Sequence, residues 1–264
     1  MLERKIIKKN KNIKSTLRRV IKKIINFYNN IIIFKKEISK VRKNNPKNLN
    51  LCGLLKYLPI WLMKLNSNPL SDKKPWIPFS GFKYLKRIVK KHMVIFEYGS
   101  GGSTLFFSKR VKYVISVEHD KVWYLKVKKI IELSKCNNCE IFLREPRINR
   151  EGSKYDFSDL GSYTSSDDAY KNMSFESYAK TINLYPDFYF DIIFIDGRSR
   201  PSCVKHAVNK LKVNGYLILD NSDIKVYKKI YEYLDNMHWK KLDFLGPGPY
   251  VQGFWQLTSW KKID

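Results

Sequence analysis

Short apolar runs recur through residues 94–260, and most of them are separated by segments with the apolar spacing of helices. Each run is too short for a helix and is bounded by glycine or polar residues, which favours buried strands. Strands that alternate with helices predict a parallel sheet that is covered by helices on both faces. The expected strands lie at residues 94–96, 113–117, 140–144, 191–195, 215–219, 239–245 and 254–260.

A glycine-rich turn, GSGGS at residues 99–103, follows the first expected strand and opens a helical pattern. Gly99 and Gly101 can adopt positive φ and carry no Cβ, so the backbone can turn sharply and a ligand can approach it closely. The start of the following helix presents unpaired N–H groups, which suit a carboxylate or a phosphate. Glu97 precedes the first glycine by two residues.

A second acid, Glu118, ends the second expected strand, 19 residues after Gly99. This is where a ribose-binding acid belongs in a nucleotide-binding βαβ unit. A glycine turn alone can simply join a strand to a helix, but the turn and the acid together indicate a nucleotide site. The dinucleotide pattern G-x-G-x-x-G needs glycine at position 104, where Thr104 stands, so NAD fits poorly.

These residues resemble the motif of class I methyltransferases that depend on S-adenosylmethionine (SAM): an acid, one residue, then G-x-G-x-G. Ser103 departs from the motif at its third glycine. The stretches FEYGSGGST, ISVEHDKVWY, FIDGRSRPSC and GYLILDNSD look like one group of bacterial methyltransferases of undefined substrate, and the resemblance covers about residues 76–260. The cofactor-binding residues that it implies are Glu97, Gly99, Ser100, Gly101, Gly102, Ser103, Glu118 and His119.

The resemblance implies a Rossmann-like doubly wound fold with a mostly parallel seven-stranded sheet and an antiparallel last strand. It also implies that a helix at residues 76–91 leads into the sheet and covers the cofactor. A long polar segment at residues 147–187 interrupts the expected core elements. Its later part, residues 175–184, has helical spacing and is expected to be the helix before the fourth strand. An insertion of this length is usually functional or disordered, so the earlier part is either a substrate lid or a surface loop.

Further acids end the fourth and fifth expected strands, Asp196 at the fourth and Asp220 with Asn221 at the fifth. Ligands of doubly wound sheets bind at the carboxyl ends of the strands, so these residues are candidates for the reaction site. Two carboxylates and an amide oxygen suit Mg²⁺, and catechol-type O-methyltransferases resemble this chain in placing an Asp and an Asp-Asn here. The same residue types are also common at helix caps and turns.

Arg198 and Arg200 stand where the catechol-type enzymes carry a lysine base. Arginine stays protonated, which makes it a poor base but a good clamp for carboxylate or phosphate. We therefore expect Asp196, Arg198 and Arg200 to be the catalytic residues of an O-methyltransferase. The arginines would hold a small-molecule or glycan acceptor, such as an acidic sugar, and Asp196 would orient or deprotonate its hydroxyl.

The N-terminal residues form a separate basic region. A lysine-rich tail is expected at 1–14, an amphipathic helix at 16–34 and a linker at 35–50, so that 1–50 precede a methyltransferase domain at 51–264. The helix face suits either an anionic membrane surface or packing against the domain or a partner chain. Its apolar positions are Leu17, Val20, Ile21, Ile24, Ile25 and Tyr28.

The charge of the chain is strongly positive and uneven. Of a formal net charge of +27, the first 50 residues contribute +14, with 16 Lys and Arg against two acids. A basic surface favours nucleic acid, anionic lipid or acidic glycan, so a nucleic-acid methyltransferase or binder that uses the tail is the alternative function. The sequence lacks the Asn/Asp-Pro-Pro-Tyr/Phe signature of base methylation and a secretory signal, so we expect a cytoplasmic protein.

Overall fold

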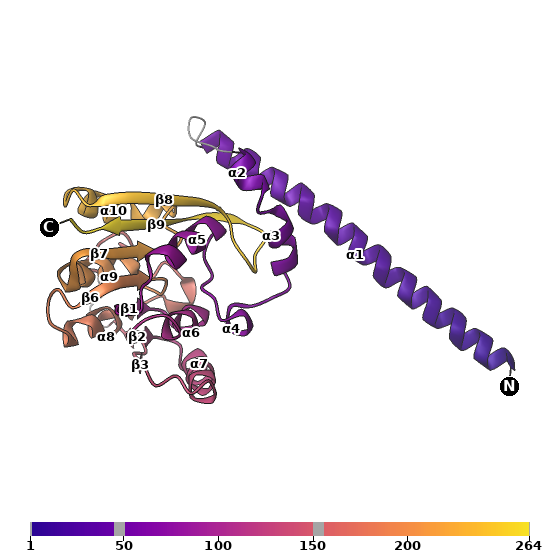
Figure 1. Cartoon of the computed structure of the whole chain (residues 1–264), viewed down its shortest axis with the longest axis horizontal. Helices are drawn as coiled ribbons and strands as arrows, with labels where there is room; N and C mark the ends of the chain where they lie inside the picture. Colours follow the sequence, from indigo (N-terminus) through magenta and orange to yellow (C-terminus); the bar gives the residue numbers. More distant parts are fainter. Residues whose placement is uncertain (1, 45–50, 150–155, 264) are drawn as a thin grey trace.

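One sheet of seven strands lies at the centre of the structure (Figure 1). The computed structural model describes residues 2–44, 51–149 and 156–263, with side chains from residue 17 onward. The strands are β1 Val94–Tyr98, β2 Tyr113–Glu118, β3 Cys139–Leu143, β6 Phe190–Ile195, β7 Leu211–Leu219, β8 Lys240–Pro247 and β9 Phe254–Lys261. Their order is β3-β2-β1-β6-β7-β9-β8, and only β9 runs against its neighbours in this sheet. The predicted Rossmann-like fold with an antiparallel last strand is confirmed.

Successive side chains of the inner strands enter two different cores. In β6, Ile192 and Phe194 point to one face of the sheet, and Ile193 and Ile195 point to the other. Because the strand is buried on both faces, it has a continuous apolar run rather than alternation. Helices α5 Phe79–Ile88 and α6 Gly102–Ser108 cover the first face, and α8 Glu176–Ala179, α9 Arg200–Ala207 and α10 Lys228–Asp235 cover the second.

Four strands of the sheet end at one level. Tyr98 of β1 pairs with Val117 of β2 and with Ile195 of β6, and Ile195 pairs with Leu219 of β7. The residues that follow these positions therefore lie along the same edge of the sheet. This register brings Glu118, Asp196 and Asp220 to that edge, although they are far apart in the sequence.

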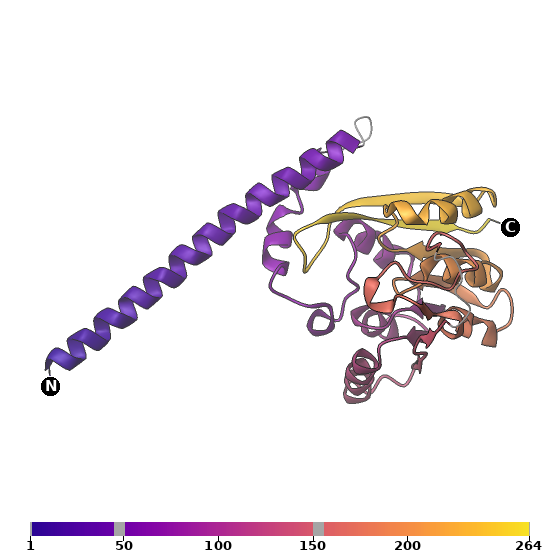
Figure 2. The same ribbon diagram turned by 180° about the vertical axis from the view of Figure 1, so that it is seen from behind.

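The N-terminal region is a single helix, α1 Leu2–Asn44, which corrects two predictions. Residues 2–14 are helical rather than a tail, and residues 35–44 continue the helix instead of forming a linker. The residues at 45–50, including Pro46, lie outside the described part. The last third of α1 packs on the domain through Phe34 and Val41, and both views show the remainder projecting away from it (Figures 1 and 2).

The helix that leads into β1 is shorter than predicted, α5 Phe79–Ile88 instead of 76–91, and it does not cover the cofactor side. It packs on the β8 and β9 end of the sheet, where Tyr84 stacks at a tilt on Phe244 with ring centroids 4.7 Å apart. The segment before it takes the covering role. Helix α4 Pro69–Asp72 lies against α6, and Trp76 reaches the carboxyl edge of the sheet.

The insertion at residues 147–187 is largely ordered in its described part. It contains a small ribbon of β4 Arg147–Ile148 and β5 Met173–Ser174, a 3₁₀ turn η1 Asp168–Tyr170, and then α8 and η2 Lys180–Leu184. Residues 150–155 lie outside the described part. Phe175, Tyr178 and Ile182 are fully buried in the core, so the later part of the insertion is the helical element that its spacing predicted.

Gly102 holds the contact between α4 and α6, and we expect Gly102→Ala to lower the stability of the fold by about 3 kcal/mol. A Cβ at this position would lie 2.3 Å from the carbonyl oxygens of both Pro69 and Lys74, so the backbone would have to move. Thermal or urea unfolding measures the effect. Gly161→Ala is the control, because its nearest atoms lie 3.4 Å away at the ends of flexible side chains.

Candidate functional site

The carboxyl edge of β1, β2 and β6 contains a cavity of about 400 Å³, which we call the glycine-turn cavity. The turn at residues 99–103 forms one wall, and Glu118, His119 and Asp120 form the next. Trp123 and residues 196–198 also line it, together with Pro69, Trp76 and Tyr170. The cavity thus gathers seven of the eight predicted cofactor-binding residues, all except Glu97.

The two glycines of the motif play different roles. Gly99 has φ of +91°, and a Cβ there would lie 3.0 Å from the carbonyl oxygen of Asp196, so the turn itself requires glycine. Gly101 has an extended φ of 164°, outside the left-handed region that the glycine motif suggested. A Cβ at Gly101 would meet only the ring of Trp123, at 3.7 Å, so this glycine leaves space in the cavity.

Glu97 lies beneath the turn and is fully buried. Its Oε2 accepts hydrogen bonds from the hydroxyls of Thr104, at 2.5 Å, and Ser116, at 2.6 Å. Burial raises the pKa of Glu97 to about 7, and the hydroxyls of Ser103, Ser116 and Thr104 offset part of this shift. Thr104 Oγ1 also accepts from the Gly101 N–H. Glu97 therefore supports the turn from below, and direct contact with a ligand stays a prediction.

Glu118 is the carboxylate that faces the cavity. Its Oε2 accepts from the N–H and the hydroxyl of Ser100, and its Oε1 accepts from the N–H groups of His119 and Asp120. Burial raises the pKa of Glu118, but the hydrogen bonds from His119, Asp120 and Ser100 outweigh it and hold the pKa below its usual value. Glu118 is therefore ionised at neutral pH and is placed at the predicted ribose position.

Aromatic side chains that the sequence patterns did not single out line the same cavity. The indole of Trp123 donates to the Ser100 carbonyl at 2.7 Å, which fixes its ring beside Gly101. Tyr170, from the insertion, lies with its hydroxyl 3.0 Å from Nε2 of His119. The insertion therefore reaches the glycine-turn cavity. Trp123 stands in the stretch ISVEHDKVWY that carried the resemblance, in the first turn of α7 Lys121–Leu133.

A second cavity of about 490 Å³ adjoins the first, and we call it the tryptophan cavity. Trp76 and Asp196 line both cavities. The remaining lining consists of Asp220, Asn221, Trp255 and residues of the loop between β8 and β9. The predicted acids Asp196, Asp220 and Asn221 are thus brought together, whereas the tryptophans come from segments that no motif marked.

Asp196 forms a buried ion pair with Arg200, which also bonds the backbone of Asp220. The Arg200 guanidinium donates to Asp196 Oδ1 at 3.1 Å and to the Asp220 carbonyl, and the Trp255 indole donates to Asp220 Oδ1 at 2.9 Å. Burial raises the pKa of Asp196 to about 6, against the opposing effect of Arg200. Burial and then repulsion by Asp196 raise the pKa of Asp220 well above its ordinary value. Both carboxyls are therefore harder to ionise than exposed ones, and the pKa of Asp220 is the more strongly raised.

The predicted arginine clamp is not present in the described part of the chain. Arg200 is buried, lines neither cavity and is occupied by Asp196, Asp220 and the Gly197 carbonyl. Arg198 lines the glycine-turn cavity, where it pairs with Asp167 at 2.7 Å. Arg200 follows a residue in the left-handed region, Ser199 with φ of 48°, which directs the first turn of α9 inward. We therefore reassign Arg200 as a positioning residue for the two acids.

The predicted Mg²⁺ ligands do not fit a metal. Arg200 already places a positive charge beside the Asp196 carboxylate, and the Trp255 indole donates to Asp220 Oδ1. Burial also raises the pKa of Asp220, which opposes the ionised carboxylate that a metal needs. Within the described ranges, no cluster of three His, Cys, Asp or Glu side chains is placed to bind a metal.

Excess Mg²⁺ should consequently leave the midpoint of thermal unfolding unchanged. A ligand raises this midpoint only if it binds the folded chain, and the guanidinium of Arg200 opposes a second cation. A matched ionic strength of NaCl is the control, because both salts screen the surface charge. A rise that is specific to Mg²⁺ and disappears in Asp220→Asn would restore the metal site.

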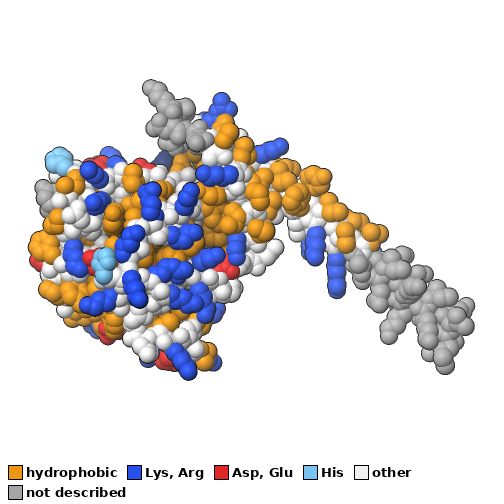
Figure 3. Space-filling model, viewed as in Figure 1, with side chains coloured by type: hydrophobic (Ala, Val, Ile, Leu, Met, Phe, Trp, Pro, Cys, Tyr) orange, Lys and Arg blue, Asp and Glu red, His pale blue; other side chains and the backbone are white. Residues whose placement is uncertain are grey.

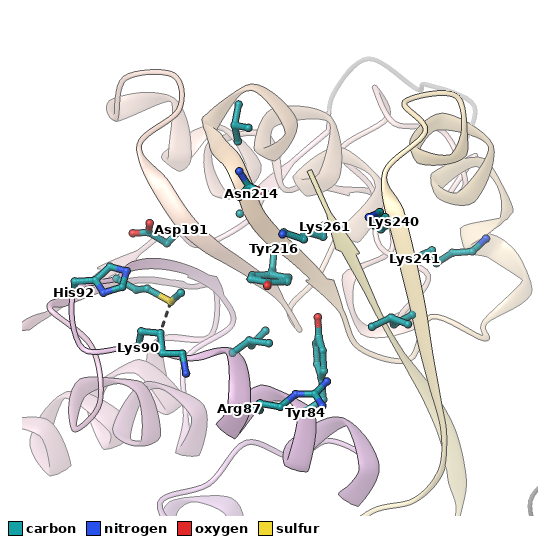
Figure 4. Close-up of a pocket in the computed structure, with 15 residues that line it drawn as sticks. Tyr84, Arg87, Lys90, His92, Asp191, Asn214, Tyr216, Lys240, Lys241 and Lys261 are labelled. Carbon is teal, nitrogen blue, oxygen red and sulfur yellow. Dashed lines mark hydrogen bonds between the residues drawn. The ribbon is translucent and has the colours of Figure 1, made fainter. Parts of the chain in front are cut away.

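The largest of these cavities, of about 900 Å³, lies at the opposite edge of the sheet. Figure 4 shows Lys240, Lys241 and Lys261 from β8 and β9 across from Arg87 and Tyr84 of α5. The cavity lies at the amino ends of the parallel strands, as Asp191 and Tyr216 in its lining show. Because doubly wound folds bind ligands at the carboxyl ends, we assign the nucleotide site to the glycine-turn cavity.

No protein-family model matches the sequence, and a search of curated proteins gives no match. Solved structures do match its fold. A protein from Klebsiella pneumoniae that is described as an O-methyltransferase aligns with a TM-score of 0.52 and 12% identity, over 88% of this chain and 99% of that one. The O-methyltransferase of Bacillus cereus, in complex with SAH, gives 0.49 and 14%, over 84% and 96%. An rRNA methylase of Streptococcus thermophilus gives 0.47 and 13%, over 69% and 93%.

The likeness to the Klebsiella pneumoniae protein spans nearly the whole of that chain and most of this one. The chain therefore has the fold of the class I SAM-dependent methyltransferases, as the glycine motif indicated. An identity of 12% shows the fold alone, and the substrate has to be argued from the site.

Proposed function

We propose that this protein is a SAM-dependent methyltransferase that acts on a hydroxyl oxygen. The observation that carries the proposal is the junction of two cavities at the carboxyl edge of the sheet, with Asp196 and Trp76 lining both. One cavity has the glycine turn and the ionised Glu118 of a nucleotide site. The other has room for an acceptor and presents a carboxylate at the junction.

The glycine-turn cavity fits SAM through groups that this chain supplies. Glu118 faces the cavity as an acceptor for a ribose diol, which would replace the Ser100 hydroxyl at its Oε2. Gly101 leaves its side of the cavity open, so a ligand can lie against the turn beside Trp123. When bound, SAM supplies an activated methyl group, and the enzyme's task is to align the acceptor with it.

The tryptophan cavity favours a neutral acceptor with an apolar or ring-shaped face. Its described lining contains Trp76, Trp255 and Phe254 but no lysine or arginine, which does not support the acidic sugar expected from the arginines. Tryptophan rings stack on flat apolar surfaces, including the faces of sugar rings. Asp196 is the general base in this proposal, because its pKa of about 6 leaves it ionised at neutral pH.

Methyl transfer from labelled SAM into fractionated cell extract tests this function. We expect label in a small-molecule or glycan fraction, as a base-stable ether. Label in nucleic acid would instead favour the alternative function that the basic N-terminus suggested. Calorimetry with SAM tests the cofactor separately, and a chain that does not bind SAM would refute the proposal.

A further inference from the structure

An apolar stripe on the projecting part of α1 has no partner within the described chain. Between residues 17 and 32, eight large apolar side chains are between 47% and 62% exposed. In the space-filling view they form a continuous band along the helix that reaches the domain (Figure 3). The stripe consists of Leu17, Val20, Ile21, Ile24, Ile25, Phe27, Tyr28 and Ile32.

An exposed apolar stripe of this size is either an interaction site or a cause of aggregation in water. Its residues recur at the spacing of one helix face, so they can be buried together by a single surface. Further along the same helix, Phe34 and Val41 are already buried against the domain. The exposed stripe is therefore adjacent to an apolar contact that the fold uses.

The charges of α1 select the kind of surface. Between residues 17 and 44 it carries nine Lys and Arg, all exposed, and one acid, Glu37. Arg18, Arg19, Lys22 and Lys23 lie on the same turns, largely on the face opposite the stripe. A second copy of this helix would bring together two strongly positive chains, which repel each other. An anionic lipid surface instead attracts the cations while its acyl region takes the apolar side chains.

Helix α1 is held against the loop that forms one wall of the tryptophan cavity. Asn30 Oδ1 accepts from Gln252 Nε2 at 2.6 Å, and Glu37 Oε2 accepts from the Phe254 N–H at 3.2 Å. The rings of Phe34 and Phe254 meet edge to face with centroids 4.9 Å apart. Any surface that binds α1 is thereby positioned relative to the opening of this cavity.

We propose that the exposed half of α1 docks the protein on an anionic bilayer surface and presents the tryptophan cavity to acceptors that reside there. The second part rests on the proposed function and makes the acceptor a membrane-associated molecule with a hydroxyl group. The helix lies on the surface in this arrangement. No helix in the described chain is long and apolar enough to span a bilayer.

Sedimentation with vesicles tests the docking without any need for methyl transfer. The full chain should sediment with phosphatidylglycerol–phosphatidylcholine vesicles and remain in the supernatant with phosphatidylcholine alone. Binding should weaken at least tenfold in high salt, because the cations act through a screened attraction. Equal binding to both vesicle types would overturn the role of the charges.

The variant Ile21→Ser/Ile24→Ser removes two apolar side chains from the stripe without changing the charge. Both are exposed, so the folded protein loses no internal packing. The matched control is Asn26→Ser/Asn29→Ser, on the opposite side of the same turns. We expect at least a tenfold loss of vesicle binding for the isoleucine pair and less than a threefold loss for the control. Equal losses would refute the stripe as the docking face.

Two further measurements distinguish the remaining outcomes. Sedimentation equilibrium without vesicles should show a monomer. A dimer of the parent that dissociates in the isoleucine variant would show that the stripe binds a second copy of the chain and not a membrane. SAM affinity should be the same in the parent and in both variants. A parent protein that binds SAM but not anionic vesicles refutes only this inference. A parent protein that binds the vesicles but not SAM refutes only the proposed function.

Discussion

Gly101→Val should abolish detectable SAM binding in calorimetry while the protein remains folded. The added side chain would enter the cavity beside Trp123 instead of the protein interior, because no other atom lies within 4 Å of a Cβ at this position. It would displace the ligand from the turn. Loss of two hydrogen bonds to a charged ligand, at about 1.5 kcal/mol each, already weakens binding by roughly 100-fold.

Gly161→Val is the matched control, since it makes the same change on the insertion, outside both cavities. Its SAM affinity should equal that of the parent. Thermal unfolding of both variants checks that the fold is retained. This check distinguishes Gly101 from Gly102, where an added Cβ would clash with the carbonyl oxygens of Pro69 and Lys74. A Gly101→Val protein that binds SAM normally would place the cofactor elsewhere.

Asp196→Asn should lower kcat by about 100-fold or more once an acceptor is known, because the amide cannot take the proton of the hydroxyl. SAM affinity should change much less, since Glu118 and the turn remain. Removing one charge from the buried group also lowers the pKa of Asp220, because its repulsion by Asp196 disappears. The amide oxygen can still accept the hydrogen bond from Arg200, so the variant can keep its fold.

The pH profile supplies a readout that a purely structural role would not change. Asp196 must be ionised to act as a base, and its pKa is raised to about 6. Turnover of the parent should therefore be constant above this value and fall as the pH decreases through it. This limb should be absent in Asp196→Asn. Asp168→Asn, which alters an exposed carboxyl outside both cavities, should leave rate and profile unchanged. An unchanged profile in Asp196→Asn would exclude Asp196 as the base.

The fold and the positions of the glycine turn and of Glu118 could be predicted from local patterns. Apolar runs mark buried strands wherever the chain alternates strands with helices. The third strand is shifted by one residue, to Cys139–Leu143, and the fifth starts earlier, at Leu211. The distance between Gly99 and Glu118 is set by one helix and one strand, so a motif can encode it. The same reasoning brought Asp196 and Asp220 to one edge.

The direction of individual side chains could not be predicted in the same way. Arg198 and Arg200 are equivalent as residue types, and both follow a strand. The left-handed conformation of Ser199 sends Arg200 into the protein, where Asp196 holds it, while Arg198 stays at the surface of the glycine-turn cavity. This difference depends on which partners the rest of the chain supplies, and it changed a predicted clamp into an internal ion pair.

By itself the sequence determined the doubly wound sheet, the acids at its carboxyl edge and the amphipathic character of the N-terminus, because each depends on periodicity or short spacing. The tertiary structure alone decided that Trp76 and Trp255 meet Asp196 in one cavity, and that α1 continues to Asn44 and contacts the loop beside that cavity. One of these contacts joins residues that are 217 positions apart in the sequence. Such contacts depend on how the surfaces of the folded elements complement one another, which no local pattern specifies.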